Sequence, residues 1–319
     1  MQTMKSPRIV FMGTPEFAVE SLDAILQNGF DVAAVVTVPD KPAGRGQKMS
    51  VSAVKEYALA HNLPLLQPEK MRDEHFLEQL RALNADLFVV VAFRMLPQCV
   101  WAMPKMGTFN LHASLLPQYR GAAPINWAII NGETETGITT FLLNEHIDEG
   151  AILLQSRTPI SEEDNLESVH DRLASMGRDL VVQTIQGLQN GTLSPQQQNP
   201  QGTLKPAPKI FKPDCAIDWS KKGNEIRNFV RGLSPYPAAT MLMGPIDKES
   251  ISFKIFDVEF EKTENNNSGI LKTDNKHFLK IGISDGYISI KSLQMSGKKK
   301  NSIEEFLRGY NVTDWKLGC

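Results

Sequence analysis

The chain has 319 residues, of which 41% are hydrophobic and 22% are charged, and its formal net charge is −2. This length favours two domains, and the composition is that of a globular protein. The near-neutral charge excludes a polycation that binds nucleic acid along its whole length. No apolar run approaches the roughly 18 residues that a membrane span needs. The apolar run at residues 9–12 is too short for the core of a secretion signal, so we expect a cytoplasmic protein without membrane contact.

Residues 8–130 alternate short apolar runs with segments of helical spacing, which predicts a Rossmann-like α/β domain. The predicted strands are residues 8–12, 31–38, 87–92 and 108–114, and the predicted helices are 17–26, 52–62, 73–84, 96–103 and 123–131. This order is typical of a doubly wound parallel sheet with helices on both faces. A nicotinamide enzyme would need G-x-G-x-x-G at the first strand-to-helix turn, where only Gly13 stands, followed by Thr14 and Pro15. The sequence therefore disfavours that class.

The α/β pattern continues beyond residue 130, and the character of the chain changes after residue 213. Two more strands are predicted at residues 137–143 and 151–156, followed by a long amphipathic helix at 165–190. Residues 194–208 are rich in Gln, Pro, Asn and Gly without periodicity, which is typical of an interdomain linker. After residue 213 come one helix, at 225–233, and short alternating segments that predict a small, OB-like β-barrel. We predict domains at residues 1–192 and 213–319, joined by a linker at 193–212.

Three polar side chains interrupt the apolar strand at residues 108–114. Alternate residues of a strand share one face, so we expect Asn110, His112 and Ser114 to lie on the same side. Asp148 follows in a later loop between two predicted strands. An amide, an imidazole and a carboxylate suit the stabilisation of a tetrahedral oxyanion while protons move at an attacking amine. The sequence therefore indicates an acyl-transfer site.

A metal site is the rival interpretation of the same residues. His112 together with His146 and Asp148 contains the two histidines and one carboxylate of non-haem iron enzymes. The separate histidine here precedes the H-x-D pair, and no oxygenase-like barrel is predicted around it. The three cysteines lie far apart, with no CxxC pair, which argues against a structural zinc site or a disulfide framework. We expect no metal.

Residues 110–117, together with residues 118–124, resemble the folate-dependent formyltransferases. The resemblance continues through nearly the whole chain and implies 10-formyltetrahydrofolate as the formyl donor. It implies catalytic roles for Asn110, His112 and Asp148. It implies folate contacts at Ser114, Leu115, Leu116, Pro117, Phe93 and Leu96. The chain departs from the family at residues 92–97, where relatives usually have a longer, glycine-containing segment.

Within the family, the resemblance is strongest to the branch that formylates the α-amine of methionyl initiator tRNA. It implies tRNA contacts at Lys41, Arg45 and Lys48, in a basic loop at residues 39–48, and at Lys298 and Lys299 beside the predicted barrel. From the residues alone, an ordinary flexible loop is the favoured interpretation of residues 39–48, and a solvated turn is an alternative interpretation of the lysines. Cationic side chains in loops suit phosphate contacts and stacking on unpaired bases. The partners implied are initiator methionyl-tRNA and the folate, and we expect a monomer.

Two further functions remain open at the level of sequence. One is formyl transfer to a small amine, such as an amino-sugar nucleotide or glycinamide ribonucleotide. The match beyond residue 213 argues against it, because those relatives share mainly the first domain. The other is a non-catalytic RNA-binding protein that has kept the fold. The presence of Asn110, His112 and Asp148 argues against that reading.

Overall fold

A computed structural model of the chain describes residues 6–43, 48–199, 202–264 and 267–318. Its contacts divide the chain into two compact units. The first comprises residues 1–121, 136–158 and 170–206, and the second comprises residues 122–135, 159–169 and 207–319. The predicted boundaries at 192 and 213, and the linker between them, stay predictions.

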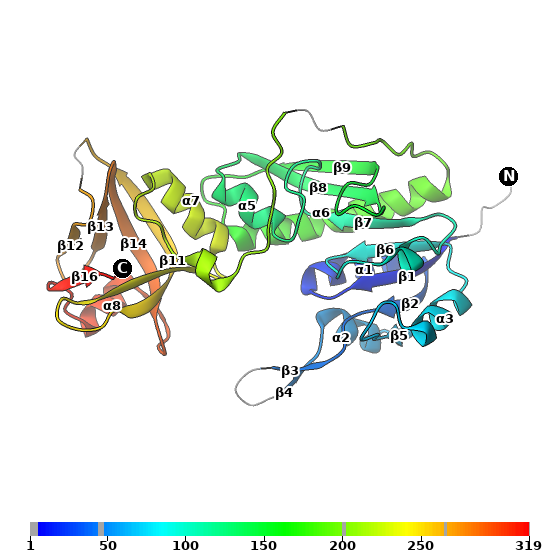
Figure 1. Cartoon of the computed structure of the whole chain (residues 1–319), viewed down its shortest axis with the longest axis horizontal. Coiled ribbons are helices and arrows are strands. Elements are labelled where there is room, and N and C mark those ends of the chain that lie inside the picture. The colour runs from blue at the N-terminus through cyan, green and yellow to red at the C-terminus, as the bar shows by residue number, and fades with distance from the viewer. Residues whose placement is uncertain (1–5, 44–47, 200–201, 265–266, 319) are drawn as a thin grey trace. The chain divides into compact units, whose positions relative to one another are not determined.

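The first unit is built on one seven-stranded sheet with the order β5-β2-β1-β6-β7-β8-β9 (Figure 1). Its strands are β1 (Arg8–Gly13), β2 (Asp31–Val36), β5 (Leu65–Leu66), β6 (Leu87–Val91), β7 (Thr108–His112), β8 (Glu135–Leu142) and β9 (Ile152–Pro159). The ladders from β5 through to β7 are parallel, whereas β8 runs antiparallel to β7. The sheet is therefore mixed and mostly parallel, which confirms the predicted α/β class.

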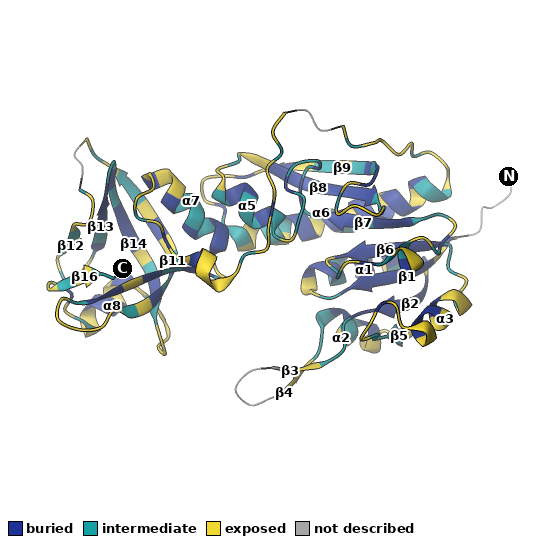
Figure 2. Cartoon of the chain, in the orientation of Figure 1, coloured by how far each residue is buried: buried dark blue, intermediate teal, exposed yellow. Residues whose placement is uncertain are grey.

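Helices cover both faces of this sheet, because its central strands are apolar on both sides. The first-unit helices are α1 (Glu16–Gln27), α2 (Ala53–Ala60), α3 (Glu74–Ala82), α4 (Gln98–Trp101) and the greater part of α6 (Leu166–Gln189). Alternate residues Val10 and Met12 of β1 share a core with the buried residues of α3 and α4. In α6, Gly177 lies against Leu111 of β7 and Ser21 of α1. Figure 2 shows these central strands as buried.

Two predicted elements of the first unit differ from the observed ones. The strand predicted at 108–114 ends at His112, and the helix predicted at 96–103 is the single turn α4. The loop predicted at 39–48 begins and ends in an antiparallel ribbon formed by β3 (Lys41–Ala43) and β4 (Lys48–Ser50). The backbone groups of these two short segments bond to each other instead of to solvent. Composition alone does not predict this pairing.

The second unit contains an antiparallel, nearly closed barrel, as the sequence predicted. The strand order is β12-β13-β14-β11-β10-β16, and β15 pairs with β14. The strands are β10 (Ala239–Pro245), β11 (Ile251–Lys262), β12 (Leu271–Thr273), β13 (Leu279–Ile283), β14 (Gly286–Met295), β15 (Lys300–Ser302) and β16 (Trp315–Leu317). Alternating residues such as Phe253 and Ile255 fill the interior, and the short helix α8 (Ile303–Gly309) adds Phe306 to this core.

Two further helices belong to the second unit, α5 (Pro124–Ile130) and α7 (Gly223–Leu233), and a single 3₁₀ turn, η1, covers Lys212–Cys215. The side chain of Asn126 in α5 donates a hydrogen bond to the carbonyl of Gly232 in α7, at 2.8 Å. A Cβ at Gly232 would approach Ile130 to 2.7 Å, so the absence of a side chain allows the two helices to pack closely. Among the described residues, no helix combines the length and the apolar character that a membrane crossing requires.

Phe253 offers a test of the barrel core. Its ring is fully buried, 5.7 Å from the ring of Phe306 and 6.3 Å from that of Trp315. Phe253→Ala should lower the free energy of unfolding of the barrel by about 3–5 kcal/mol, because it leaves a cavity. Leu242→Ala, on the neighbouring strand but 40% exposed, is the matched control and should cost no more than about 1 kcal/mol. Urea unfolding with limited proteolysis measures both, and equal losses would contradict the assignment of this core.

Candidate functional site

Asn110 and His112 lie on one face of β7, two residues apart, at the carboxyl end of the strand. Asn110 is half-buried. Over the described ranges of the chain, its side-chain amide has no hydrogen bond to protein. The carboxyl ends of strands in open α/β sheets are where ligands bind. The Asn110 amide is therefore available to a ligand.

The ring of His112 is buried, with 6% of the residue exposed, and the environment distinguishes its two nitrogens. Nε2 lies 2.8 Å from the carbonyl oxygen of Tyr119. Because a carbonyl only accepts, Nε2 carries the hydrogen and donates it. Nδ1 faces Asp148, whose Oδ2 is 3.9 Å away, close enough for attraction between charges but too far for a hydrogen bond.

Asp148 lies in the loop between β8 and β9 with a left-handed backbone, φ 55°. Its carboxylate accepts a hydrogen bond from the backbone N–H of Gly121 at 2.9 Å. Its own carbonyl accepts one from Nε2 of Gln198 at 2.8 Å. The loop thus brings a carboxylate, only 14% exposed, to the imidazole of His112. The structure brings Asn110, His112 and Asp148 into the first unit together, although Asp148 is distant in sequence.

A hydrogen bond between two of its own residues, Ser114 and Gln118, stabilises the loop that follows β7. Ser114 lies beyond the end of the strand, so the predicted alignment with Asn110 and His112 on one strand face was wrong. Its hydroxyl is buried and donates to the carbonyl of Gln118 at 2.7 Å, because the chain turns there instead of continuing as a strand. Leu116 is also buried, whereas Leu115 and Pro117 are half-buried. Their contacts with a folate, and that of Ser114, stay predictions.

Thr139 of β8 fastens this loop to the sheet and was not found from the sequence. It stands opposite His112 in the β7–β8 ladder. Its hydroxyl donates to the carbonyl of Ser114 at 2.7 Å and accepts from the N–H of Leu116 at 3.2 Å. Gln155 of β9 donates to the same hydroxyl and to the carbonyl of Leu116, each at 2.9 Å. A lone threonine in a strand carries no sequence signal for this role.

Arg94 anchors the segment that contains Phe93 and Leu96, both of which are predicted to contact the folate. Its guanidinium donates to the carbonyl of Glu69 at 2.9 Å and to that of Pro68, and it lies 5.5 Å from the ring centre of Phe93. Burial lowers the pKa of Arg94. Leu96 is buried in the core beside α4, and Phe93 packs against that core. The predicted folate contacts of Phe93 and Leu96 remain untested by this geometry.

The described residues among those predicted to contact tRNA lie in turns and ribbon ends. Lys41 is exposed on β3 and Lys48 begins β4. Arg45 lies outside the described residues. Lys298 and Lys299 are exposed in the turn between β14 and β15, where Gln294 donates to the carbonyl of Lys298 at 2.7 Å. Their assignment to tRNA stays a prediction.

The metal alternative finds no support in the placement of His146. Its side chain is 63% exposed, and Nδ1 lies 4.0 Å from Oε1 of Glu145. In the part of the chain that the structure describes, no three His, Cys, Asp or Glu side chains converge as metal ligands. The arrangement that is present, an open amide donor beside an imidazole and a carboxylate, suits acyl transfer to an amine.

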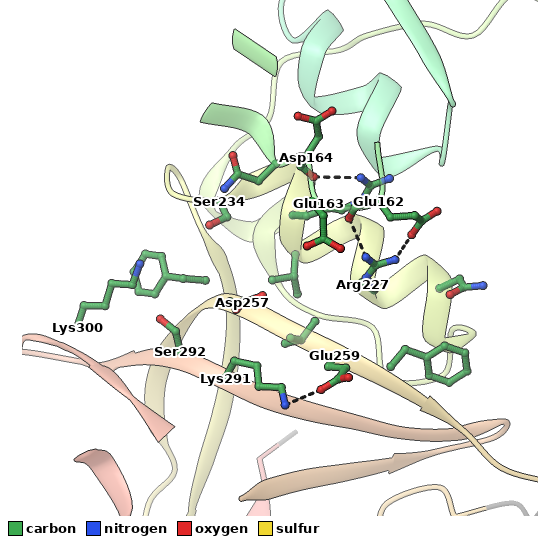
Figure 3. A pocket seen from close by; sticks show the side chains of 17 residues that line it. Glu162, Glu163, Asp164, Arg227, Ser234, Asp257, Glu259, Lys291, Ser292 and Lys300 are labelled. Carbon is green, nitrogen blue, oxygen red and sulfur yellow. Dashed lines mark hydrogen bonds and ion pairs between the residues drawn. The ribbon is translucent and has the colours of Figure 1, made fainter. Parts of the chain in front are cut away.

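A cavity of about 680 Å³ lies in the second unit and contains none of these three residues. Figure 3 shows it between the 162–165 segment, α7 and strands β11 and β14. Its charges are largely paired within the protein. Arg227 pairs with Glu162 and lowers the pKa of that carboxyl, and Lys291 pairs with Glu259 at 2.5 Å.

Comparison with known proteins identifies the family. A model described as "Formyl transferase" matches residues 7–185, and one described as "Formyl transferase, C-terminal domain" matches residues 209–311. This chain belongs to the formyltransferase family. The family predicted from residues 110–124 is thereby confirmed.

Two relatives of this formyltransferase match over almost their whole length. The methionyl-tRNA formyltransferase of Bacteroides fragilis is 52% identical over 311 residues, which cover 96% of each chain. That of Flavobacterium johnsoniae is 52% identical over 312 residues, which cover 98% of each chain. Among solved structures, the sugar 3N-formyl transferase WlaRD has a TM-score of 0.64 at 22% identity, covering 92% of this chain and 100% of its own. That likeness shows a shared fold.

The hydroxyl of Thr139 provides a test of how the loop is held. Thr139→Val should leave the Leu116 N–H and the Ser114 carbonyl without this partner, at about 1–3 kcal/mol for each group left unpaired. Urea unfolding measures the loss, and amide hydrogen exchange at Leu116 should accelerate. Thr139→Ser keeps the hydroxyl and is the control. Normal exchange at Leu116 in the valine variant would contradict the assigned role.

Proposed function

We propose that this chain transfers the formyl group of 10-formyltetrahydrofolate to the α-amine of methionyl initiator tRNA. The observation that carries the proposal is the 52% identity to methionyl-tRNA formyltransferases over 96% of the chain. The arrangement of Asn110, His112 and Asp148 supports it, because it provides the groups that such a transfer needs.

Asn110 and His112 act on the oxygen of the formyl group. The Asn110 amide donates to that oxygen as it becomes negative, and a protonated His112 stabilises the same charge. One such donor contributes roughly 2.7–4 kcal/mol to lowering the barrier. Asn110 suits this role because its amide lies at the strand end and donates to no other described group.

Asp148 balances the charge of protonated His112 and accepts the proton of the attacking amine. When the ring of His112 is protonated, the carboxylate 3.9 Å away balances its charge in a largely buried setting. The same carboxylate, directly or through water, accepts the proton that the attacking amine loses. As the bond between the formyl carbon and N10 of the folate breaks, that proton passes to N10, and tetrahydrofolate leaves. Gly121 supports this role because its N–H holds one carboxylate oxygen.

The remaining assignments rest on the family and on position. Folate contacts are proposed at Ser114–Pro117, Phe93 and Leu96. The tRNA contacts are proposed at Lys41, Arg45, Lys48, Lys298 and Lys299, whose charges suit phosphate. We further propose that the protein acts as a monomer in the cytoplasm, and that residues 1–192 and 213–319 form its domains.

A competition between acceptors tests the proposed function. Purified protein receives 10-formyltetrahydrofolate with methionyl initiator tRNA, methionyl elongator tRNA or an amino-sugar nucleotide, and the formylated products are counted. We expect product mainly from the initiator tRNA. Product from the small amine alone would keep the chemistry but replace the acceptor, and no product from any acceptor would refute a formyltransferase.

Asp148→Asn tests the assigned chemistry. The amide keeps an oxygen for the Gly121 N–H but loses the negative charge, so kcat should fall about 100-fold or more while KM for the folate changes little. Glu145→Gln removes a charge from an exposed position in the same loop and should leave kcat unchanged. Steady-state kinetics of both variants decides. An unchanged kcat in Asp148→Asn would remove Asp148 from the mechanism.

A further inference from the structure

Gln198 lies in the irregular segment that follows α6, and its amide group uses all of its hydrogen-bonding capacity beside Asp148. Nε2 donates to the carbonyl of Asp148 at 2.8 Å and to that of Gly150 at 2.9 Å. Oε1 accepts from Nη2 and Nε of Arg120, at 2.8 and 3.2 Å. Because guanidinium only donates and carbonyls only accept, the orientation of this amide is fixed.

Arg120 links Gln198 to the same loop from the other side. Its Nη1 forms an ion pair with Oε1 of Glu149 at 2.8 Å. Three consecutive loop residues, 148–150, are therefore held by one pair of side chains. The base of the loop is tight as well, since a Cβ at Gly150 would stand 1.6 Å from the carbonyl oxygen of Leu142.

We infer that Gln198 is a positioning residue for Asp148: by binding two carbonyls of the 148–150 loop, it holds the carboxylate against His112. This inference rests on the proposed function. Asp148 has a left-handed backbone, φ 55°, which is uncommon outside glycine although aspartate tolerates it better than most residues, and the bonds from Gln198 to the loop carbonyls help to hold it. The separation between Oδ2 and Nδ1 is 3.9 Å, so a small movement of the loop changes the charge interaction.

The alternative is that Gln198 merely ties its own segment to the sheet. That segment has other attachments nearby. Gln196 and Ile152 exchange two backbone hydrogen bonds, at 2.7 and 2.8 Å, and the carbonyl of Lys205 accepts from the N–H of Tyr119 at 2.7 Å. The Gln198 side chain adds contacts to the 148–150 loop that a tether does not need.

Gln198→Glu separates the two roles. The carboxylate still accepts from Arg120, so the tether persists, but it has no N–H for the carbonyls of Asp148 and Gly150. A displaced catalytic group costs about 10-fold to 100-fold in rate, so we expect kcat to fall in this range. KM for both substrates should change by less than about twofold. Gln197→Glu introduces the same charge at an exposed neighbour and should behave as wild type.

A crystal structure of Gln198→Glu provides a second measurement, independent of turnover. We expect the 148–150 loop to shift and the distance between Asp148 Oδ2 and His112 Nδ1 to change. If the control formylates methionyl-tRNA and Gln198→Glu has the same kcat, the inference is overturned. If neither wild type nor control transfers a formyl group, the proposed function fails instead. The crystal structure then decides alone, and an unmoved Asp148 overturns the positioning role.

Discussion

The hydrogen bond from His112 to the carbonyl of Tyr119 is the constraint on which the site depends. It occupies Nε2, so only Nδ1 is left to face Asp148. The position of that carbonyl depends in turn on Tyr119, whose backbone is left-handed and whose N–H donates to Lys205. A residue of the loop after β7 thus holds the buried imidazole by its Nε2. The other nitrogen, Nδ1, is left to face Asp148. Without this bond the ring could turn either nitrogen toward the carboxylate.

The sequence predicted the fold class because the hydrophobic patterns of its strands are distinct. Continuous apolar runs such as residues 87–92 indicate strands that are buried on both faces, and alternating residues such as Phe253 and Ile255 indicate strands with one buried face. The antiparallel direction of β8 could not be predicted in this way. Strand direction depends on which neighbour the backbone pairs with, and side-chain periodicity is the same in both directions.

The candidate site was predictable in part, for a related reason. Alternation brings Asn110 and His112 together locally, whereas no local pattern links them to Asp148, which lies in a later loop. The prediction that Ser114 shares the strand face was wrong because the strand ends before Ser114. There the hydroxyl of Thr139 donates to the backbone carbonyl of Ser114. Such side-chain contacts to backbone are tertiary, and they override the local alternation on which the prediction relied.

Gln198 illustrates the limit most clearly. Residues 196–198 are three consecutive glutamines in a segment whose composition indicates a linker, and nothing local distinguishes them. In the folded chain, Gln196 pairs through its backbone, Gln197 is exposed, and Gln198 turns its amide toward Arg120 and the Asp148 loop. The distinction arises entirely from what the segment packs against.

The loops of the site share one physical design. Tyr119 and Asp148 both hold left-handed backbones without being glycine, and both carry the groups that meet His112. Strained backbone of this kind persists only when surrounding hydrogen bonds determine it fully. Here the bonds to these backbones come from Lys205, whose carbonyl accepts from the N–H of Tyr119, and from Gln198, which donates to the carbonyl of Asp148. Because Gln198 and Lys205 both belong to the irregular segment after α6, that segment is part of what shapes the site, although its composition is that of a connector.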